Sequence, residues 1–241
     1  MPIYFEKEAF KAQAVASRSY ALKRIGYNKD SEYDVVDSVM NQVYLDTDYL
    51  KEAWGFNYTE NINKLRSAVN ETLDEVIYYE DEVIDAMFFS TSNGYTEDVN
   101  NIFNLDLPYL KSVDSFWDKD TSSAFKSSTS ISLKSFYEKL NLAYSDKLNI
   151  EVIKRSHTNR ILKLKINGIE ISSKDIYSKL GLKSYDFTIK QSGDKVIINT
   201  CGYGHGVGLS QYGALGMAKE GYNYIEILKY YYTGVYIDKI K

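Results

Sequence analysis

The dipeptide Asn167-Gly168 constrains the fold more than any other feature of the chain. It separates two short apolar runs, residues 161–166 and 169–171. Asn-Gly tolerates the positive φ angles of a two-residue type I′ turn, whose twist matches that of paired antiparallel strands. We therefore predict a β-hairpin over residues 161–171, so the chain contains antiparallel β structure.

The rest of the chain changes between helical and β patterns. Strong helix formers run from residue 6 to residue 25 and stop at Gly26, whereas residues 150–200 have mostly β character. Helices and antiparallel hairpins in separate runs are typical of an α+β fold. No internal repeat is apparent. The further predicted elements are helices over residues 61–75 and 133–140 and from a Ser173 cap to Leu180, two short C-terminal helices separated at Gly221, and strands at residues 42–45, 76–79, 83–89 and on either side of residues 192–194.

Length, charge and cysteine content limit the class of protein. The 241 residues suffice for a single domain, residues 1–241, and we expect two lobes around a cleft with a lobe connection near residues 114–149. The net charge of −4 shows no basic excess, which argues against a nucleic-acid partner. The single cysteine, Cys201, excludes an internal disulfide. No apolar run reaches about 18 residues, so we expect no membrane span, and the start of the chain does not resemble a signal peptide.

A glycine-dense segment near the C-terminus is the strongest candidate site. Glycine occupies every second position of residues 202–208, around His205. Glycine permits unusual backbone angles and the close approach of a ligand. Ser210, Gln211 and Tyr212 follow where a helix should begin, so Ser210 is placed to cap that helix and free N–H groups there would point at the ligand.

Four segments of the chain carry a family resemblance. They are EAFKAQAVASRSYAL near the N-terminus, FFSTSNGYTEDV and LPYLKSVDS in the middle, and GHGVGLSQYGA near the C-terminus. In this order, and over nearly the whole chain, they resemble the SpoIID family, which comprises stage II sporulation protein D and its amidase-enhancer relatives. The chain is thus expected to be one SpoIID-like domain.

The resemblance implies a peptidoglycan lytic transglycosylase that acts during engulfment in sporulation. Such an enzyme cleaves the bond between N-acetylmuramic acid and N-acetylglucosamine without water. One carboxylic acid protonates the leaving oxygen and then, as a carboxylate, accepts a proton from the sugar's own primary hydroxyl, which closes a 1,6-anhydro ring. The acid needs a raised pKa, so it should lie in a partly apolar cleft.

The acid/base residue that the family pattern implies is a glutamate directly before a Met-Pro pair. Met1-Pro2 is that pair here, so the glutamate is absent from the sequence. We therefore expect the chain as written to bind glycan strands and to cleave them little or not at all. Glu8 is the nearest substitute, although it matches an ordinary helix position of the family.

The family motifs also imply roles for residues that this chain retains. His205, Gln211 and Tyr212 are the candidate catalytic residues. Lys11 and Arg18 would hold the acetamido or lactyl groups of the glycan. The candidate substrate-binding residues are Lys11, Arg18, Ser90, Ser92, Tyr95 and Ser210. We expect one cleft to be lined by Lys11, Arg18, Ser90, Ser92, His205, Gln211 and Tyr212.

No metal or cofactor is expected. Some family members hold zinc with His and Cys ligands ahead of a Gln-x-Tyr segment. Here Val35, Met40 and Asn41 stand where ligands would be expected, and none of these side chains binds zinc well. Cys201 and His205 are four positions apart, but two ligands do not make a structural zinc site.

Two functions stay open from the sequence. The first is the lytic transglycosylase, and the alternative is a non-catalytic glycan-binding or amidase-enhancing module. Both imply peptidoglycan glycan strands as the partner, with a cell-wall amidase and other engulfment proteins as further candidates. Both also imply an extracytoplasmic place facing the cell wall; family members are often membrane-anchored, and this sequence shows no anchor.

Overall fold

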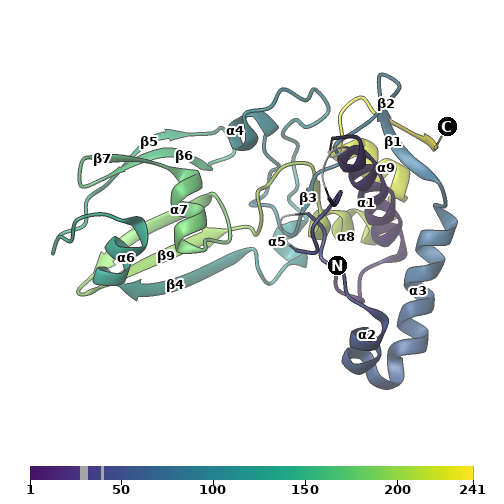
Figure 1. Cartoon of the computed structure of the whole chain (residues 1–241), viewed down its shortest axis with the longest axis horizontal. Helices are drawn as coiled ribbons and strands as arrows, with labels where there is room; N and C mark the ends of the chain where they lie inside the picture. The colour runs from purple at the N-terminus through teal and green to yellow at the C-terminus, as the bar shows by residue number, and fades with distance from the viewer. Residues whose placement is uncertain (28–31, 39–40, 241) are drawn as a thin grey trace. The chain divides into compact units, whose positions relative to one another are not determined.

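The computed structural model describes residues 1–27, 32–38 and 41–240, and it divides into two compact units (Figure 1). The first unit comprises Met1–Phe88 and Ala214–Lys241, and the second comprises Phe89–Gly213. Helices and antiparallel sheets occur together, which confirms the predicted α+β class. The predicted lobe connection near residues 114–149 lies inside the second unit, whereas the chain crosses between units at residues 88–89 and 213–214.

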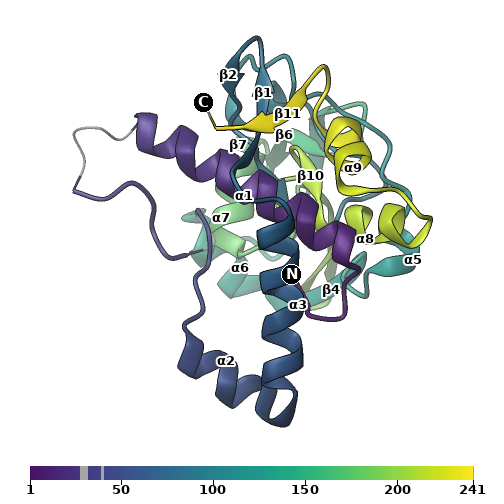
Figure 2. The same ribbon diagram turned by 90° about the vertical axis from the view of Figure 1, so that its right-hand side faces the viewer.

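The first unit is built around the long helix α1 (Lys7–Tyr27). Ala9, Ala12 and Ala16 are fully buried on it, and such small side chains let neighbouring elements approach closely. Figure 2 shows α1 lying across α3 and beside α9, and α1 also packs on strand β1. The elements are α1, α2 (Thr47–Trp54), a short 3-10 turn (Gly55–Asn57), α3 (Tyr58–Glu71), α9 (Tyr224–Tyr231), and a sheet of order β11-β1-β2 formed by β1 (Glu75–Tyr79), β2 (Glu82–Val83) and β11 (Tyr236–Lys239).

Three predictions for the early part of the chain are corrected by the structure. Helix α1 continues through Gly26 to Tyr27. Residues 42–45 form no strand, because the Gln42 amide donates to the Ser17 carbonyl of α1 (3.0 Å) and fixes this segment to the helix. The hairpin at residues 76–79 is present, but its second strand is only Glu82–Val83. Among the described residues, no helix has both the length and the apolar character needed to cross a bilayer.

The second unit contains two three-stranded antiparallel sheets. One has the order β4-β9-β8 and the other β5-β6-β7. The predicted Asn167-Gly168 turn is confirmed, with φ angles of 48° and 83° between β6 and β7. The elements are α4 (Val99–Phe103), α5 (Asp118–Thr121), β4 (Lys126–Ser132), α6 (Leu133–Leu140), β5 (Ile150–Arg155), β6 (Ile161–Ile166), β7 (Ile169–Ser172), α7 (Ser173–Leu180), β8 (Asp186–Ser192), β9 (Lys195–Cys201) and β10 (Leu209–Ser210); β3 (Phe88–Phe89) and α8 (Gln211–Lys219) contain the two crossings between units.

The second unit is internally duplicated, so the prediction of no repeat is wrong. Residues 131–142 (ISLKSFYEKLNL) and 171–182 (ISSKDIYSKLGL) are identical at seven of twelve positions. Each copy has a capping serine, Ser132 or Ser172, an eight-residue helix, and a left-handed residue at its end, Asn141 or Gly181. The cap of α7 is therefore Ser172 and not Ser173.

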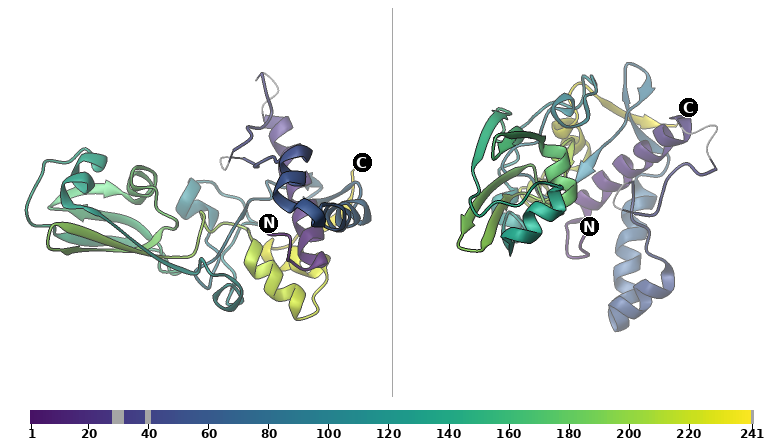
Figure 3. Two further views of the ribbon diagram at one scale, coloured as in Figure 1. Left: turned by 90° about the horizontal axis from the view of Figure 1, so that it is seen from below. Right: turned by 60° about the vertical axis from the view of Figure 1, so that its left-hand side comes forward.

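The two copies exchange their first strands. Hairpin β5-β6 follows the first copy and hairpin β8-β9 follows the second, but β4 pairs with β9 and β7 pairs with β6. In Figure 1 and Figure 3 the strands of this unit run alongside one another, and α6 and α7 pack on them. A shared core joins both copies, with Phe136, Leu164, Ile176 and Ile198 among its most buried members. The exchange makes the duplicated region a single folded body.

Candidate functional site

The glycine-dense segment forms a loop that lies against the serine-rich loop within the second unit. Thr91 and Tyr203 exchange two backbone hydrogen bonds, of 2.9 and 2.7 Å. Gly202 has a φ of 87°, and a Cβ there would lie 2.9 Å from the Thr91 carbonyl oxygen. A side chain at Gly204 would meet the Phe89 Cβ at 2.8 Å. Both glycines are therefore needed for close packing as well as for backbone angle.

Arg160 is the support on which the middle of this loop rests. Its guanidinium lies flat against Gly206, where a Cβ would be 2.5 Å from Nη2 and 2.7 Å from Cζ. The side chain is 1% exposed and donates to the Tyr95 carbonyl (2.9 Å) and the Thr158 hydroxyl (2.8 Å). The backbone N–H of Glu97 donates to the Gly206 carbonyl (2.7 Å). This arrangement fixes the loop on both sides of Gly206.

Buried Glu97 balances the charge of Arg160. The two groups lie 3.8 Å apart, and both are almost completely buried. Burial raises the pKa of the Glu97 carboxyl, but hydrogen bonds from Ser156 and Thr158 and the Arg160 charge together lower the pKa below its usual value. Glu97 is thus an anion that holds Arg160, because removing either partner would leave the other charge buried alone.

A second buried acid, Asp118, ties the serine-rich loop to the start of α8. Its carboxylate accepts hydrogen bonds from the Ser92 N–H (2.7 Å), the Ser115 hydroxyl (2.7 Å) and the Ser210 hydroxyl (2.5 Å). Burial raises the pKa of Asp118, and these hydrogen bonds oppose that rise. Sequence reasoning missed Asp118, which lies just beyond the LPYLKSVDS motif, and it missed Arg160 and Glu97 as well.

His205 is held in one orientation and one tautomer. Its Nδ1 accepts a hydrogen bond from the Val207 N–H (3.1 Å), so in the neutral ring the proton is on Nε2. The ring packs against Phe89 and Phe103, with centroids 5.7 and 5.4 Å away. The histidine is half-buried on the glycine loop.

The structure brings most of the predicted site residues of the second unit together. The Ser90 carbonyl accepts from the Tyr212 N–H (3.1 Å) and from the Ser210 hydroxyl (3.4 Å). Ser210 caps α8 through the Gly213 N–H (3.3 Å), as expected. The expectation of free N–H groups at this helix start is wrong, because both the Tyr212 and Gly213 groups are used within the unit.

Solvent access separates these predicted residues into two sets. The hydroxyls of Ser92 and Ser210 are fully buried, and Ser92 donates to the Ser115 carbonyl (2.9 Å). They therefore hold the loops in place. The tyrosine ring at position 95 is 49% exposed, and the partly exposed residues are Ser90, His205, Gln211 and Tyr212. Their predicted roles in catalysis or binding stay predictions.

The predicted site residues of the first unit bond to their own neighbours. Lys11 forms ion pairs with Glu8 (2.8 Å) and Glu71 (2.9 Å). Desolvation lowers the pKa of Lys11, but the bonds to these two carboxylates outweigh it and raise the pKa overall. Arg18 donates to the carbonyls of Thr72 (2.8 Å) and Glu75 (2.6 Å), just beyond the end of α3. Lys11 and Arg18 belong to the first unit and the serine and glycine loops to the second, so the shared cleft stays a prediction.

The segment expected to lack zinc ligands has other contacts in the structure. The Asn41 amide donates to the Tyr20 hydroxyl (2.8 Å) and accepts from the Val36 N–H (2.9 Å). Val35 is an exposed side chain, and Met40 lies outside the described residues. These contacts give Asn41 a structural role, as a link between this segment and α1.

One three-residue group among the described residues has the spacing of metal ligands. Single ligand atoms of Glu97, Asp98 and His157 lie within 4.8 Å of one another. Both oxygens of Glu97 already accept hydrogen bonds from protein donors, and the Arg160 guanidinium is 3.8 Å away. A cation there would displace existing bonds beside a positive charge, so these residues fit a metal poorly.

The fold and site define an α+β protein with a histidine on a glycine loop that two buried acids hold in place. The family model of the stage II sporulation protein, SpoIID, matches residues 1–79. "Stage II sporulation protein D" of Bacillus amyloliquefaciens and that of Bacillus subtilis are each 39% identical over 244 residues, which cover 99% of this chain and 71% of the relative. The "Amidase enhancer" of Bacillus subtilis is 28% identical over 97% of this chain and 38% of its own length. The chain belongs to the SpoIID family of sporulation proteins.

Proposed function

We propose that this protein is a peptidoglycan lytic transglycosylase that cleaves glycan strands during engulfment. The observation that carries the proposal is His205, partly accessible on a loop that Arg160 and Gly206 hold rigid, in a chain of the SpoIID family. Rigid placement of polar groups is what a glycosidic bond needs for cleavage, because catalysis depends on orientation of the reacting atoms.

The proton transfers require one carboxylic acid with a raised pKa. In the family pattern this acid precedes the Met-Pro pair, which is Met1-Pro2 here. Such an acid needs partly apolar surroundings that raise its pKa and keep it protonated for its role as the acid.

The other groups would bind and orient the glycan. The ring of His205 would contact a sugar oxygen, and the exposed ring of Tyr95 offers an apolar face to a sugar ring. Gln211 and Tyr212 would contribute polar groups at the start of α8. Lys11 and Arg18 of the first unit would contact acetamido or lactyl groups by exchanging some of their present bonds.

The proposal is tested by mass spectrometry of digested glycan strands. The 241-residue chain and a chain extended by a glutamate before Met1, with the native segment that leads into it, are compared. General acid/base assistance typically contributes about 10²–10⁴-fold, so the extended chain should release anhydro-ended products and the unextended chain few or none. Absence of anhydro products from the extended chain, despite measurable binding, would contradict the proposed reaction.

An alternative is a glycan-binding module that stimulates a cell-wall amidase. The likeness to a protein named "Amidase enhancer" favours this alternative. An amidase assay with and without the chain separates the two functions. Both place the protein outside the cytoplasmic membrane, facing the wall, and both take glycan strands as the ligand.

A further inference from the structure

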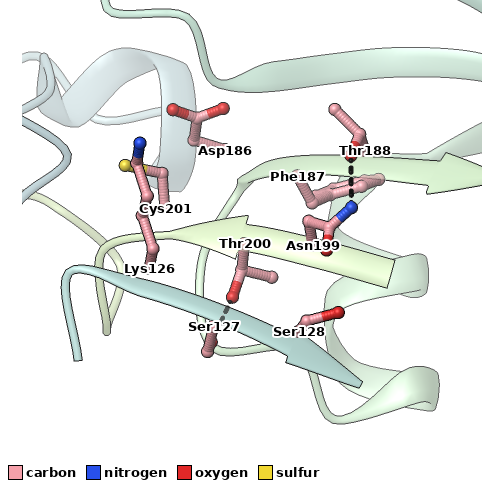
Figure 4. A pocket seen from close by; sticks show the side chains of 9 residues that line it. All are labelled: Lys126, Ser127, Ser128, Asp186, Phe187, Thr188, Asn199, Thr200 and Cys201. Atoms are coloured by element: carbon pink, nitrogen blue, oxygen red, sulfur yellow. Dashed lines mark hydrogen bonds between the residues drawn. The ribbon is translucent and has the colours of Figure 1, made fainter. Parts of the chain in front are cut away.

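The outward face of sheet β4-β9-β8 carries a cavity apart from the glycine loop. Residues directly opposite in an antiparallel sheet point to the same side. Lys126, Cys201 and Asp186 form one such cross-strand row, and Ser128, Asn199 and Thr188 form the next. These two rows line a cavity of about 390 Å³, shown in Figure 4.

The acid at one end of this cavity is fixed in position. Asp186 is 9% exposed, and its two oxygens accept hydrogen bonds from the Asn93 amide (2.8 Å) and the Asn159 amide (3.0 Å). Figure 4 shows Asp186, Lys126 and Cys201 gathered at this end, with Asn199 bonded to Thr188 (3.4 Å) further along the strands. A carboxylate held by two donors keeps lone pairs for a ligand and needs no rearrangement to accept from it.

The duplicated sheet β5-β6-β7 provides an internal comparison for this face. Its outward row contains Lys165 between Glu151 and Glu170, and Lys163 pairs with Glu170 at 2.5 Å. That pattern of alternating charge is what a solvated sheet face shows. On β4-β9-β8 the cavity is instead lined by hydroxyl and amide groups, and the charges of its lining residues Lys126 and Asp186 balance.

We propose that this cavity is a second saccharide subsite, which holds an N-acetylated hexosamine ring of the glycan strand. The inference rests on the proposed function and adds a ligand contact to it. Hydroxyl and amide groups match the hydroxyls and acetamido group of such a ring, and the balanced charge suits a neutral ligand. Cys201 at one end of the subsite lies four residues before His205, so the Cα atoms of these two residues are at most about 14 Å apart. A short oligosaccharide spans that distance.

The test blocks the cavity from one strand and uses a neighbouring position as control. Ser128 and Ser130 are both exposed, both on β4 and both on its outward face, but only Ser128 lines the cavity. We expect Ser128→Trp to weaken binding of an N-acetylglucosamine hexamer by about tenfold in titration calorimetry, because several hydrogen bonds are lost. Ser130→Trp should change it by less than about twofold.

A second variant and a shorter ligand make the result decisive. Thr188→Val keeps the shape of the side chain and should weaken the hexamer by about threefold, since one hydrogen bond is lost. Binding of the disaccharide, which is too short to reach both sites, should be the same in Ser128→Trp and in the original chain. Equal hexamer affinity in Ser128→Trp and Ser130→Trp would overturn the subsite alone. A chain that binds no hexamer at all would overturn the proposed function together with the subsite.

Discussion

In the first unit the charged side chains of α1 bond to neighbouring helices, whereas in the second unit buried charges hold loops around a histidine. Lys11 joins α1 to α3 through Glu71, and it also lies 5.4 Å from the ring centre of Tyr224 in α9. In the second unit, Arg160 and Asp118 instead bond to loop segments, and these loops carry accessible groups. The comparison teaches that a charged side chain on a helix can serve to join elements, and that a buried charge can serve to fix a loop that carries accessible groups.

The largest effect is expected for Gly206→Ala, which tests whether Arg160 supports the glycine loop. The new Cβ would meet the Arg160 guanidinium at 2.5 Å, and the φ of 85° is unfavourable for alanine. We expect a loss of about 2–4 kcal/mol in unfolding free energy and a loss of most glycan binding. Gly193→Ala is the matched control, since its φ is 60° and no atom lies within 4 Å of the new Cβ. It should cost only about 1 kcal/mol in urea unfolding. Equal effects of the two variants would show that Arg160 does not support the loop.

Local structure could be predicted from the sequence, whereas the contact between Arg160 and Gly206 could not. Asn167-Gly168 specifies its hairpin through local backbone angles, and the serines before α6 and α7 cap helices within three residues, so such elements are visible in the sequence. Arg160 is 46 positions from Gly206, and nothing in the intervening sequence indicates that they touch. The alternating glycines were the available signal, because every second residue without a side chain implies that something lies close by.

The duplication was hidden for a related reason. Its two copies are 40 positions apart and match only over twelve residues, while the hairpins that follow them have diverged. Strand exchange between the copies is a long-range pairing, which no local pattern encodes. The family resemblance pointed to two loops that lie together in the structure, but it could not tell the buried hydroxyls of Ser92 and Ser210 from the accessible groups beside them.

Asp118 allows a pH test of the second unit. Burial raises the pKa of this carboxyl in the folded protein above its value of about 3.9 in the unfolded chain. The folded state then holds the proton more tightly than the unfolded state, so the contribution of Asp118 to stability falls as pH rises from about 4 through the raised pKa. Chemical unfolding between pH 4 and pH 7 should show this slope, and Asp118→Asn should flatten it. An unchanged slope in the variant would assign the pH dependence to another group.

Lys11→Met tests the role of a charged side chain on α1 in the first unit. The change removes the ion pairs to Glu8 and Glu71, which are partly solvent-exposed, so we expect a loss of about 1 kcal/mol in unfolding free energy. The proposed contact of Lys11 with the glycan would also be lost, so glycan affinity should fall by more than about threefold. A fall of less than about twofold would make Lys11 a structural link only. Calorimetric binding and thermal unfolding of the same sample decide between these outcomes.

The smallest effect is expected for Glu8→Gln, which tests whether Glu8 is the catalytic acid. One oxygen of Glu8 accepts from the Tyr224 N–H at the start of α9 (2.8 Å), and the other pairs with Lys11 (2.8 Å). Glutamine keeps an oxygen for the first bond but turns an NH2 group toward the Lys11 ammonium, so the second contact is lost while Lys11 keeps Glu71; stability should change by about 0.5 kcal/mol. In a chain extended by a glutamate before Met1, Glu8→Gln should leave the yield of anhydro products unchanged, because a residue engaged on both oxygens is a poor proton donor. If the unextended chain releases anhydro products and Glu8→Gln abolishes them without loss of stability, Glu8 carries the proton transfer and the first unit contributes the chemistry.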